Sequence, residues 1–114
     1  MAEEPDPRAF ENVEPTDIAA DVAAGTVFLI DVRETSEWVT LHASGAVHIP
    51  LGDVREALPE LAKEADGRVI AFICASGKRS AAAAEAAAGA DLPRILNVAG
   101  GTAAWQKADL PTEP

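Results

Sequence analysis

The sequence has a single cysteine, and it lacks the long apolar runs that mark membrane proteins. One cysteine excludes an intramolecular disulfide, so the chain is not expected to be a disulfide-stapled secreted domain. No apolar run approaches the ~18 residues that a membrane-spanning helix needs. Residues 1–7 contain neither a cationic nor an apolar stretch, so we expect no signal peptide and a reducing, cytoplasmic location.

Basic residues are also scarce, because 9 Lys and Arg face 19 Asp and Glu, which gives a formal net charge of −10. No basic stripe occurs, and nucleic acids and anionic membranes would be repelled, so neither is an expected partner. The acidity is best explained as an aid to solubility. A length of 114 residues with 48% hydrophobic residues fits one folded domain with a modest core.

Apolar runs of strand length alternate along the chain with segments of helical pattern. The expected strands cover residues 27–30, 46–49, 69–73 and 95–98. The expected helices cover residues 16–25, 34–41, 53–65, 80–88 and 102–107. Because the strands are continuously apolar, the sequence predicts an α/β domain with a central parallel sheet of about five strands and helices on both faces.

The ends of this pattern set the expected domain limits. Residues 1–12 are interpreted as a flexible acidic N-terminal segment, and residues 13–112 as the domain. The last residues, 110–114, are expected to fray. Within the domain, Thr16 or Asp17 is expected to cap the first helix.

Two further residues mark expected helix irregularities. Pro59 should perturb its helix because proline has no amide hydrogen to donate. Gly89 is expected to end the helix that follows the cysteine.

Cys74 lies between the apolar run 69–73 and the alanine-rich segment 80–88, where a strand, a tight loop and a helix start are expected. Backbone N–H groups and the positive end of a helix dipole gather at such a corner and favour thiolate over thiol. A cysteine after an apolar strand is often an inert core residue. Here the residues that follow favour a nucleophilic sulfur.

The loop after the cysteine combines small and cationic side chains. Ala75, Ser76 and Gly77 leave room for backbone amides to turn inward, and Gly77 can adopt a positive φ at little cost. Lys78 and Arg79 bring two positive charges. The loop from Ala75 to Arg79 is therefore predicted to bind an anionic substrate beside Cys74.

Asp31 and Arg33 follow another apolar strand, and parallel strands bring their carboxyl ends to one edge of the sheet. In a functional role, these residues would support the cysteine loop or its rim. In a structural role, Asp31 would cap a helix and Arg33 would pair with Glu37 along it. The structural role is the preferred interpretation.

Two histidines and two tryptophans also suggest sites. His42, His48 and the distant cysteine lack a recognised metal-ligand spacing, so no metal site is predicted, and His48 is expected to bond to backbone. Trp38 and Trp105 are expected in the core or in a pocket wall.

Several short motifs occur in an order and spacing that resemble the single-domain rhodaneses, a family of sulfurtransferases. The resemblance covers nearly all of residues 13–112. The motifs are Leu29-Ile-Asp-Val-Arg33, Glu37-Trp38, His42, Gly45-Ala46, His48-Ile-Pro50, Cys74-Ala-Ser-Gly-Lys-Arg-Ser80, Gly100-Gly101 and Ala104-Trp105.

The resemblance implies a thiosulfate sulfurtransferase that works through a covalent intermediate. The Cys74 thiolate would take the outer sulfur of a donor such as thiosulfate, carry it as a persulfide, and pass it to cyanide or to a thiol, which could belong to a protein. No metal or organic cofactor is implied. Ser80 follows the arginine as in the family and would bond near the thiolate. Ala75 departs from the family, in which a cationic or polar residue is common at this position.

Two alternatives belong to other functional classes. The chain could be a non-catalytic sulfur carrier or a regulatory protein-binding module. A phosphatase or an arsenate reductase is the other alternative. Only four residues separate Cys74 from Arg79, whereas related phosphatases have five, and no second cysteine is present to resolve a disulfide. Both features favour sulfur chemistry.

Overall fold

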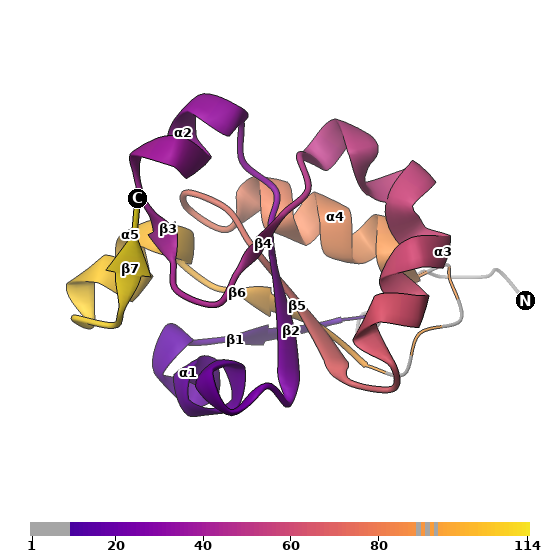
Figure 1. The fold of residues 1–114 in the computed structure, drawn as a ribbon, viewed down its shortest axis with the longest axis horizontal. Coiled ribbons are helices and arrows are strands. Elements are labelled where there is room, and N and C mark those ends of the chain that lie inside the picture. Colours follow the sequence, from indigo (N-terminus) through magenta and orange to yellow (C-terminus); the bar gives the residue numbers. More distant parts are fainter. Residues whose placement is uncertain (1–9, 89, 91, 93) are drawn as a thin grey trace, which may run out of the picture.

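The computed structural model describes residues 10–88, 90, 92 and 94–114, and its centre is a parallel sheet with the strand order β1-β6-β5-β2-β4 (Figure 1). The strands of this sheet are β1 (Glu11–Val13), β2 (Val27–Asp31), β4 (Val47–His48), β5 (Val69–Ile73) and β6 (Ile95–Val98). The helices are α1 (Pro15–Ala24), α2 (Thr35–Thr40), α3 (Val54–Ala65), α4 (Lys78–Ala88) and α5 (Gly101–Lys107), with a 3-10 turn at Leu51–Asp53. The predicted α/β fold is confirmed.

Side chains alternate between two buried faces of the sheet. Phe28 and Ile30 of β2 belong to one core cluster, to which α3 and α4 contribute. Leu29 of the same strand belongs to a second cluster with residues of α1 and α5. Both faces are therefore covered, which explains why the central strand β5 is apolar at every position and its neighbour β2 at every position before Asp31.

The alanine-rich helix α4 lies close against the sheet. Ala83, Ala84 and Ala87 are fully buried and pack with Phe72 of β5. Alanine has a high helix propensity and a small side chain, so the helix can approach the strand closely. The first residue of α4 is Lys78, two residues earlier than predicted, which brings the start of the helix nearer to Cys74.

The ends of the chain differ from the sequence prediction. Strand β1 begins at Glu11, inside the segment expected to be flexible, and pairs with β6 in the register Glu11↔Leu96. At the other end, β7 (Thr112–Glu113) pairs with β3 (His42–Ala43), so the expected frayed end is wrong there. Strand pairing across the molecule therefore includes residues 11–13 and 112–113.

The structure also differs from two of the local helix predictions. The N-cap of α1 is Glu14, whose N–H donates to Asp17 at 2.9 Å, so neither Thr16 nor Asp17 is the cap. Helix α3 continues through Pro59. Gly89 lies outside the described residues.

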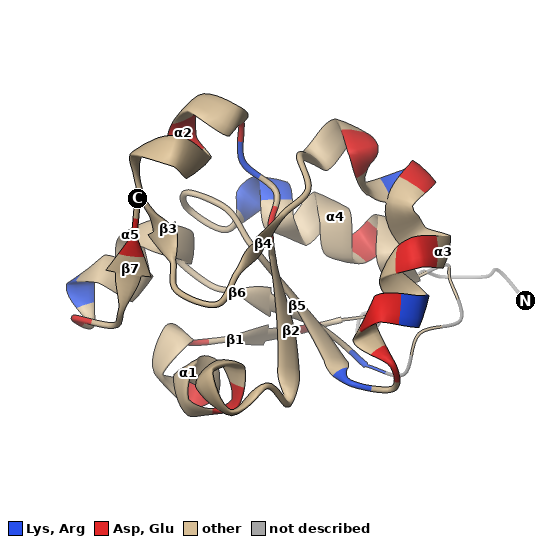
Figure 2. Ribbon diagram, viewed as in Figure 1, with Lys and Arg blue, Asp and Glu red and all other residues tan. Residues whose placement is uncertain are grey.

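Strand register brings the predicted functional residues to one edge of the sheet. Asp31 is the register partner of Ile73, so the carboxyl ends of β2 and β5 lie side by side, immediately before Cys74. Lys and Arg residues gather at the start of α4, whereas α3 carries both acidic and basic residues (Figure 2). Among the described residues, no helix is long and apolar enough to span a membrane.

Candidate active site

Cys74 lies at the end of β5 with hydrogen-bond donors directed at its sulfur. The Gly77 N–H donates to Sγ at 3.0 Å, and the Ser80 hydroxyl donates at 3.3 Å. The Cys74 side chain is 1% exposed, with the hydrophobic core on one side and this loop on the other. The sulfur thus combines burial with a polar cradle.

The pKa of the Cys74 thiol is lowered from its ordinary value. Burial alone would raise the pKa, because it disfavours the charged thiolate. The Ser80 hydroxyl and the backbone N–H groups of Ser80, Gly77 and Ser76 outweigh burial, since each hydrogen bond stabilises the negative sulfur. This balance favours the thiolate form of Cys74.

The start of α5 anchors the peptide backbone on the other side of Cys74. The Thr102 N–H and hydroxyl donate to the Cys74 carbonyl at 2.7 and 3.0 Å, and the Ala103 N–H donates to the Ala75 carbonyl at 3.2 Å. A Cβ at Gly101 would overlap the Cys74 carbonyl oxygen and lie 2.7 Å from the Ala75 carbonyl carbon. Only glycine permits this approach. Gly101 is one of the sequence motif residues, whereas no sequence signal indicated the role of Thr102.

Gly77 is held by hydrogen bonds at both its backbone N–H and its backbone carbonyl. Its φ is +106°, so its N–H turns toward the sulfur, as the sequence analysis expected of this glycine. Its carbonyl accepts hydrogen bonds from Asn97 Nδ2 at 3.3 Å and from the Ala81 N–H at 3.2 Å. Asn97, on the neighbouring strand β6, is a second supporting residue that no local sequence signal revealed.

Arg79 forms a bidentate ion pair with Glu37 of α2. Its Nη1 and Nη2 donate to the two carboxylate oxygens at 2.8 and 3.0 Å. The Arg79 guanidinium holds the pKa of Glu37 at about 2, below the ordinary value of 4.5. The sequence predicts that Arg79 and Lys78 bind the donor. In the structure, the Arg79 guanidinium is ion-paired with Glu37. Lys78 is exposed at the first position of α4.

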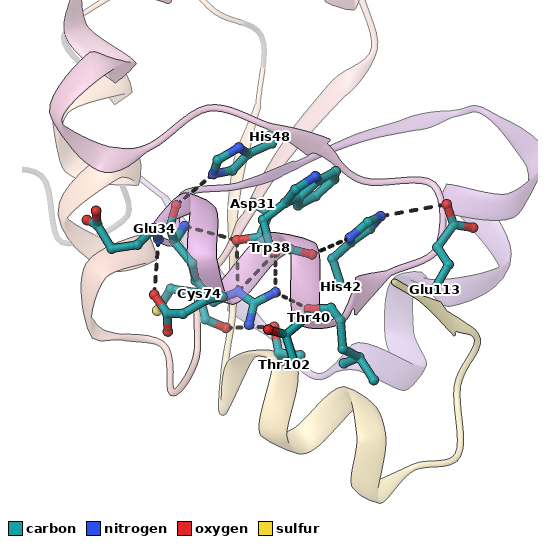
Figure 3. A network of polar contacts seen from close by, with 12 residues as sticks. Asp31, Glu34, Trp38, Thr40, His42, His48, Cys74, Thr102 and Glu113 are labelled. Atoms are coloured by element: carbon teal, nitrogen blue, oxygen red, sulfur yellow. Dashed lines mark hydrogen bonds and ion pairs between the residues drawn. The ribbon is translucent and has the colours of Figure 1, made fainter.

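Asp31 and Arg33 form a buried pair at the edge of the site (Figure 3). Asp31 accepts hydrogen bonds from Arg33 Nε and Nη2 and from the Arg33 backbone N–H at 2.9 Å. Arg33 Nη2 also donates to the Leu41 carbonyl at 2.6 Å. Arg33 therefore pairs with Asp31, not with Glu37 as the structural interpretation expected. The pair holds the end of α2, which forms one wall of the site.

A cavity of about 500 Å³ opens between α2 and α5, beside the cysteine loop. Its wall contains charged side chains already engaged in ion pairs, together with hydroxyl, amide and apolar groups. The lining residues are Arg33, Ser36, Glu37, Thr40, Leu41, Ala75, Thr102, Ala103 and Gln106. We call it the α2–α5 cavity.

The two histidines support the wall that carries α2. The Trp38 ring stacks between His42, with centroids 3.4 Å apart, and His48, at 5.0 Å (Figure 3). His42 Nδ1 donates to the Trp38 carbonyl at 2.8 Å, and His48 Nε2 donates to the Arg33 carbonyl at 2.8 Å. The expected backbone bond of His48 is present. Among the described residues, no group of three or more His, Cys, Asp and Glu could hold a metal ion.

Comparison with known proteins shows which family the chain belongs to. The model of the family described as "Rhodanese-like domain" matches residues 14–108. A solved rhodanese-related protein from Thermoplasma volcanium has a TM-score of 0.79 and 28% identity, and the alignment covers 91% of this chain and 98% of the other. The chain belongs to the rhodanese-like family.

Curated relatives from Bacillus subtilis carry names that describe sulfur chemistry. The proposed sulfurtransferase YtwF is 36% identical over 70% of this chain and 74% of its own length. The proposed sulfur carrier protein YrkF is 38% identical over 68% of this chain and 40% of its own length. Relatives such as YrkF and the Synechocystis protein slr1261, of which 46% is covered, are more than twice as long as the region they share with this chain.

Proposed function

We propose that the protein is a sulfurtransferase that moves sulfane sulfur through a Cys74 persulfide. The observation that carries the proposal is the cradle of Gly77 and Ser80 donors around a sulfur whose pKa is lowered. Such a thiolate is both a nucleophile and, once sulfurated, an anion that the same loop can hold. Family membership and the relatives named for sulfur transfer support the same chemistry.

The reaction uses an anionic sulfane donor, of which thiosulfate is the simplest. The Cys74 thiolate forms a bond to the outer sulfur, the donor S–S bond breaks, and its electron pair leaves on sulfite. The outer sulfur of the Cys74 persulfide would lie about 2 Å beyond Sγ, near the backbone amides of Ser76 and Gly77. A thiophilic acceptor, cyanide or a thiol, then attacks that outer sulfur and restores the Cys74 thiolate.

Intact-mass spectrometry after incubation with thiosulfate tests this function. The wild-type protein should gain the mass of one sulfur atom, and cyanide should remove it with release of thiocyanate. Cys74→Ser should show neither change. A wild-type chain that stays unmodified with every sulfane donor, or a Cys74→Ser variant that still transfers sulfur, would contradict the proposal.

A second candidate is a sulfur carrier that delivers its persulfide only to a protein acceptor. The relative named as a sulfur carrier favours it, because that protein is 38% identical over the shared region. The two candidates differ in the second half-reaction. A carrier would form the persulfide and keep it when cyanide or small thiols are added. A sulfurtransferase would transfer the sulfur to these acceptors and turn over.

A further inference from the structure

The arginine that faces the cysteine loop already has an anionic partner. Both terminal nitrogens of Arg79 donate to Glu37, and the two side chains are 35% and 33% exposed. A guanidinium binds a carboxylate and an oxyanion with the same pair of donors. Thiosulfate, a dianion, would meet the negative Glu37 carboxylate as it approached the Arg79 guanidinium.

Glu37 is itself held in place by α2. It is the third residue of that helix, and its Oε1 accepts the Glu34 N–H at 3.0 Å while also binding Arg79. Its pKa of about 2 keeps the carboxylate charged throughout the neutral range. The negative charge opposite Arg79 is thus a fixed property of the site.

The α2–α5 cavity that adjoins this ion pair suits an organic molecule. Its volume of about 500 Å³ lies within the range of small-molecule sites and far exceeds what thiosulfate fills. Away from the ion-paired residues, its wall offers Ser36, Thr40 and Gln106 for hydrogen bonds and Leu41 and Ala103 for apolar contact. This lining matches an uncharged polar body attached to a sulfur atom.

We propose that Glu37 is a specificity-determining residue that disfavours thiosulfate and selects an organic persulfide, whose carbon-bearing part lies in the α2–α5 cavity. This inference rests on the proposed sulfur transfer through Cys74. The Cys74 thiolate bonds to the outer sulfur of the donor persulfide, the donor S–S bond breaks, and the electron pair leaves on the organic thiolate. No oxidant or reductant is required, and the leaving group carries one charge where sulfite carries two.

Persulfide formation should be timed with two donors, thiosulfate and the persulfide of N-acetylcysteine methyl ester, whose organic body is uncharged. The wild-type chain should prefer the organic donor. Glu37→Gln should raise kcat/KM for thiosulfate about tenfold, through KM, because one negative charge leaves the vicinity of Arg79. The rate with the organic donor should change less than about threefold, because it carries only one charge. Glutamine keeps an oxygen that can accept the Glu34 N–H, so α2 retains its cap.

Asp17→Asn is a matched control for Glu37→Gln. Asp17 occupies the same position of α1, accepts the Glu14 N–H at 2.9 Å, and loses the same charge on substitution. Helix α1 packs on the opposite side of the sheet from the cysteine loop (Figure 1). This variant should leave the kinetics with both donors unchanged.

The double variant Glu37→Gln, Arg79→Gln separates an effect through Arg79 from a general one. If Glu37 acts by pairing with Arg79, Glu37→Gln should leave the kinetics with both donors unchanged in the Arg79→Gln background. Three results would overturn the inference: unchanged kinetics with both donors in Glu37→Gln, equal gains with both donors, or the same gain in Asp17→Asn. Absence of persulfide with either donor would instead refute the proposed function, so the two failures are distinguishable.

Discussion

The Ser80 hydroxyl should set much of the reactivity of Cys74. Ser80 is fully buried, and its hydroxyl donates to Sγ at 3.3 Å. Ser80→Ala removes that donor without adding bulk and leaves the backbone amides of Gly77 and Ser80 in place. Burial still disfavours the thiolate in the variant, so the pKa of the Cys74 thiol should rise.

The size of this effect follows from the hydrogen bond that is lost. A hydrogen bond to a charged group contributes about 1.5–3 kcal/mol. A sulfur acceptor at 3.3 Å belongs at the weak end of that range. Since about 1.4 kcal/mol corresponds to a factor of ten, the thiolate fraction near neutral pH should fall about tenfold.

The pH dependence of alkylation by iodoacetamide measures this fraction directly, because only the thiolate reacts. Ser76→Ala is the control: Ser76 is exposed on the same loop, and the substitution keeps its backbone N–H. The Ser80→Ala profile should move to higher pH, whereas the Ser76→Ala profile should match wild type. Superimposed profiles for wild type and Ser80→Ala would refute the assigned role of the hydroxyl.

Three further predictions concern stability, each measured by urea unfolding. Gly101→Ala should destabilise the fold by at least ~2 kcal/mol more than Gly67→Ala, because both glycines have positive φ but only a Cβ at 101 meets backbone; equal losses would contradict this. Asp31→Asn should cost about 3–5 kcal/mol, since it leaves Arg33 buried and unpaired, while the exposed Asp53→Asn should cost little. The pKa of Glu37 is lowered to about 2, so its ion pair stabilises the fold above pH 4.5 and loses that contribution as the pH falls toward 2. In Glu37→Gln, the loss of unfolding free energy between pH 4.5 and pH 2 should be smaller by up to about 1 kcal/mol, because the pair is partly exposed. The same pH dependence as wild type would contradict this.

Elements with a strong local signal could be predicted from the sequence. Strands β5 and β6 have the predicted limits, because β5 is an uninterrupted apolar run and β6 is apolar except for Asn97. Strand β1 could not be found this way, since Glu11 and Asn12 are exposed polar residues at a sheet edge. What makes them a strand is their pairing with β6, far along the chain.

The same distinction applies to the site. The loop around Cys74 was predictable because its strand, small residues and helix start are contiguous. The Glu37 partner of Arg79 lies 42 residues away, and the Thr102 anchor lies 28 residues beyond the cysteine. Contacts of this kind depend on how whole elements pack, which no short sequence window contains.

The bonds from Thr102 to the Cys74 carbonyl have a consequence for biosynthesis. A nascent chain that has left the ribosome only as far as α4 contains the cysteine and its strand but not the helix that fixes the loop. The Cys74 carbonyl would gain these two anchoring bonds only when α5 has emerged, so the final geometry of the loop depends on a helix that is synthesised after it.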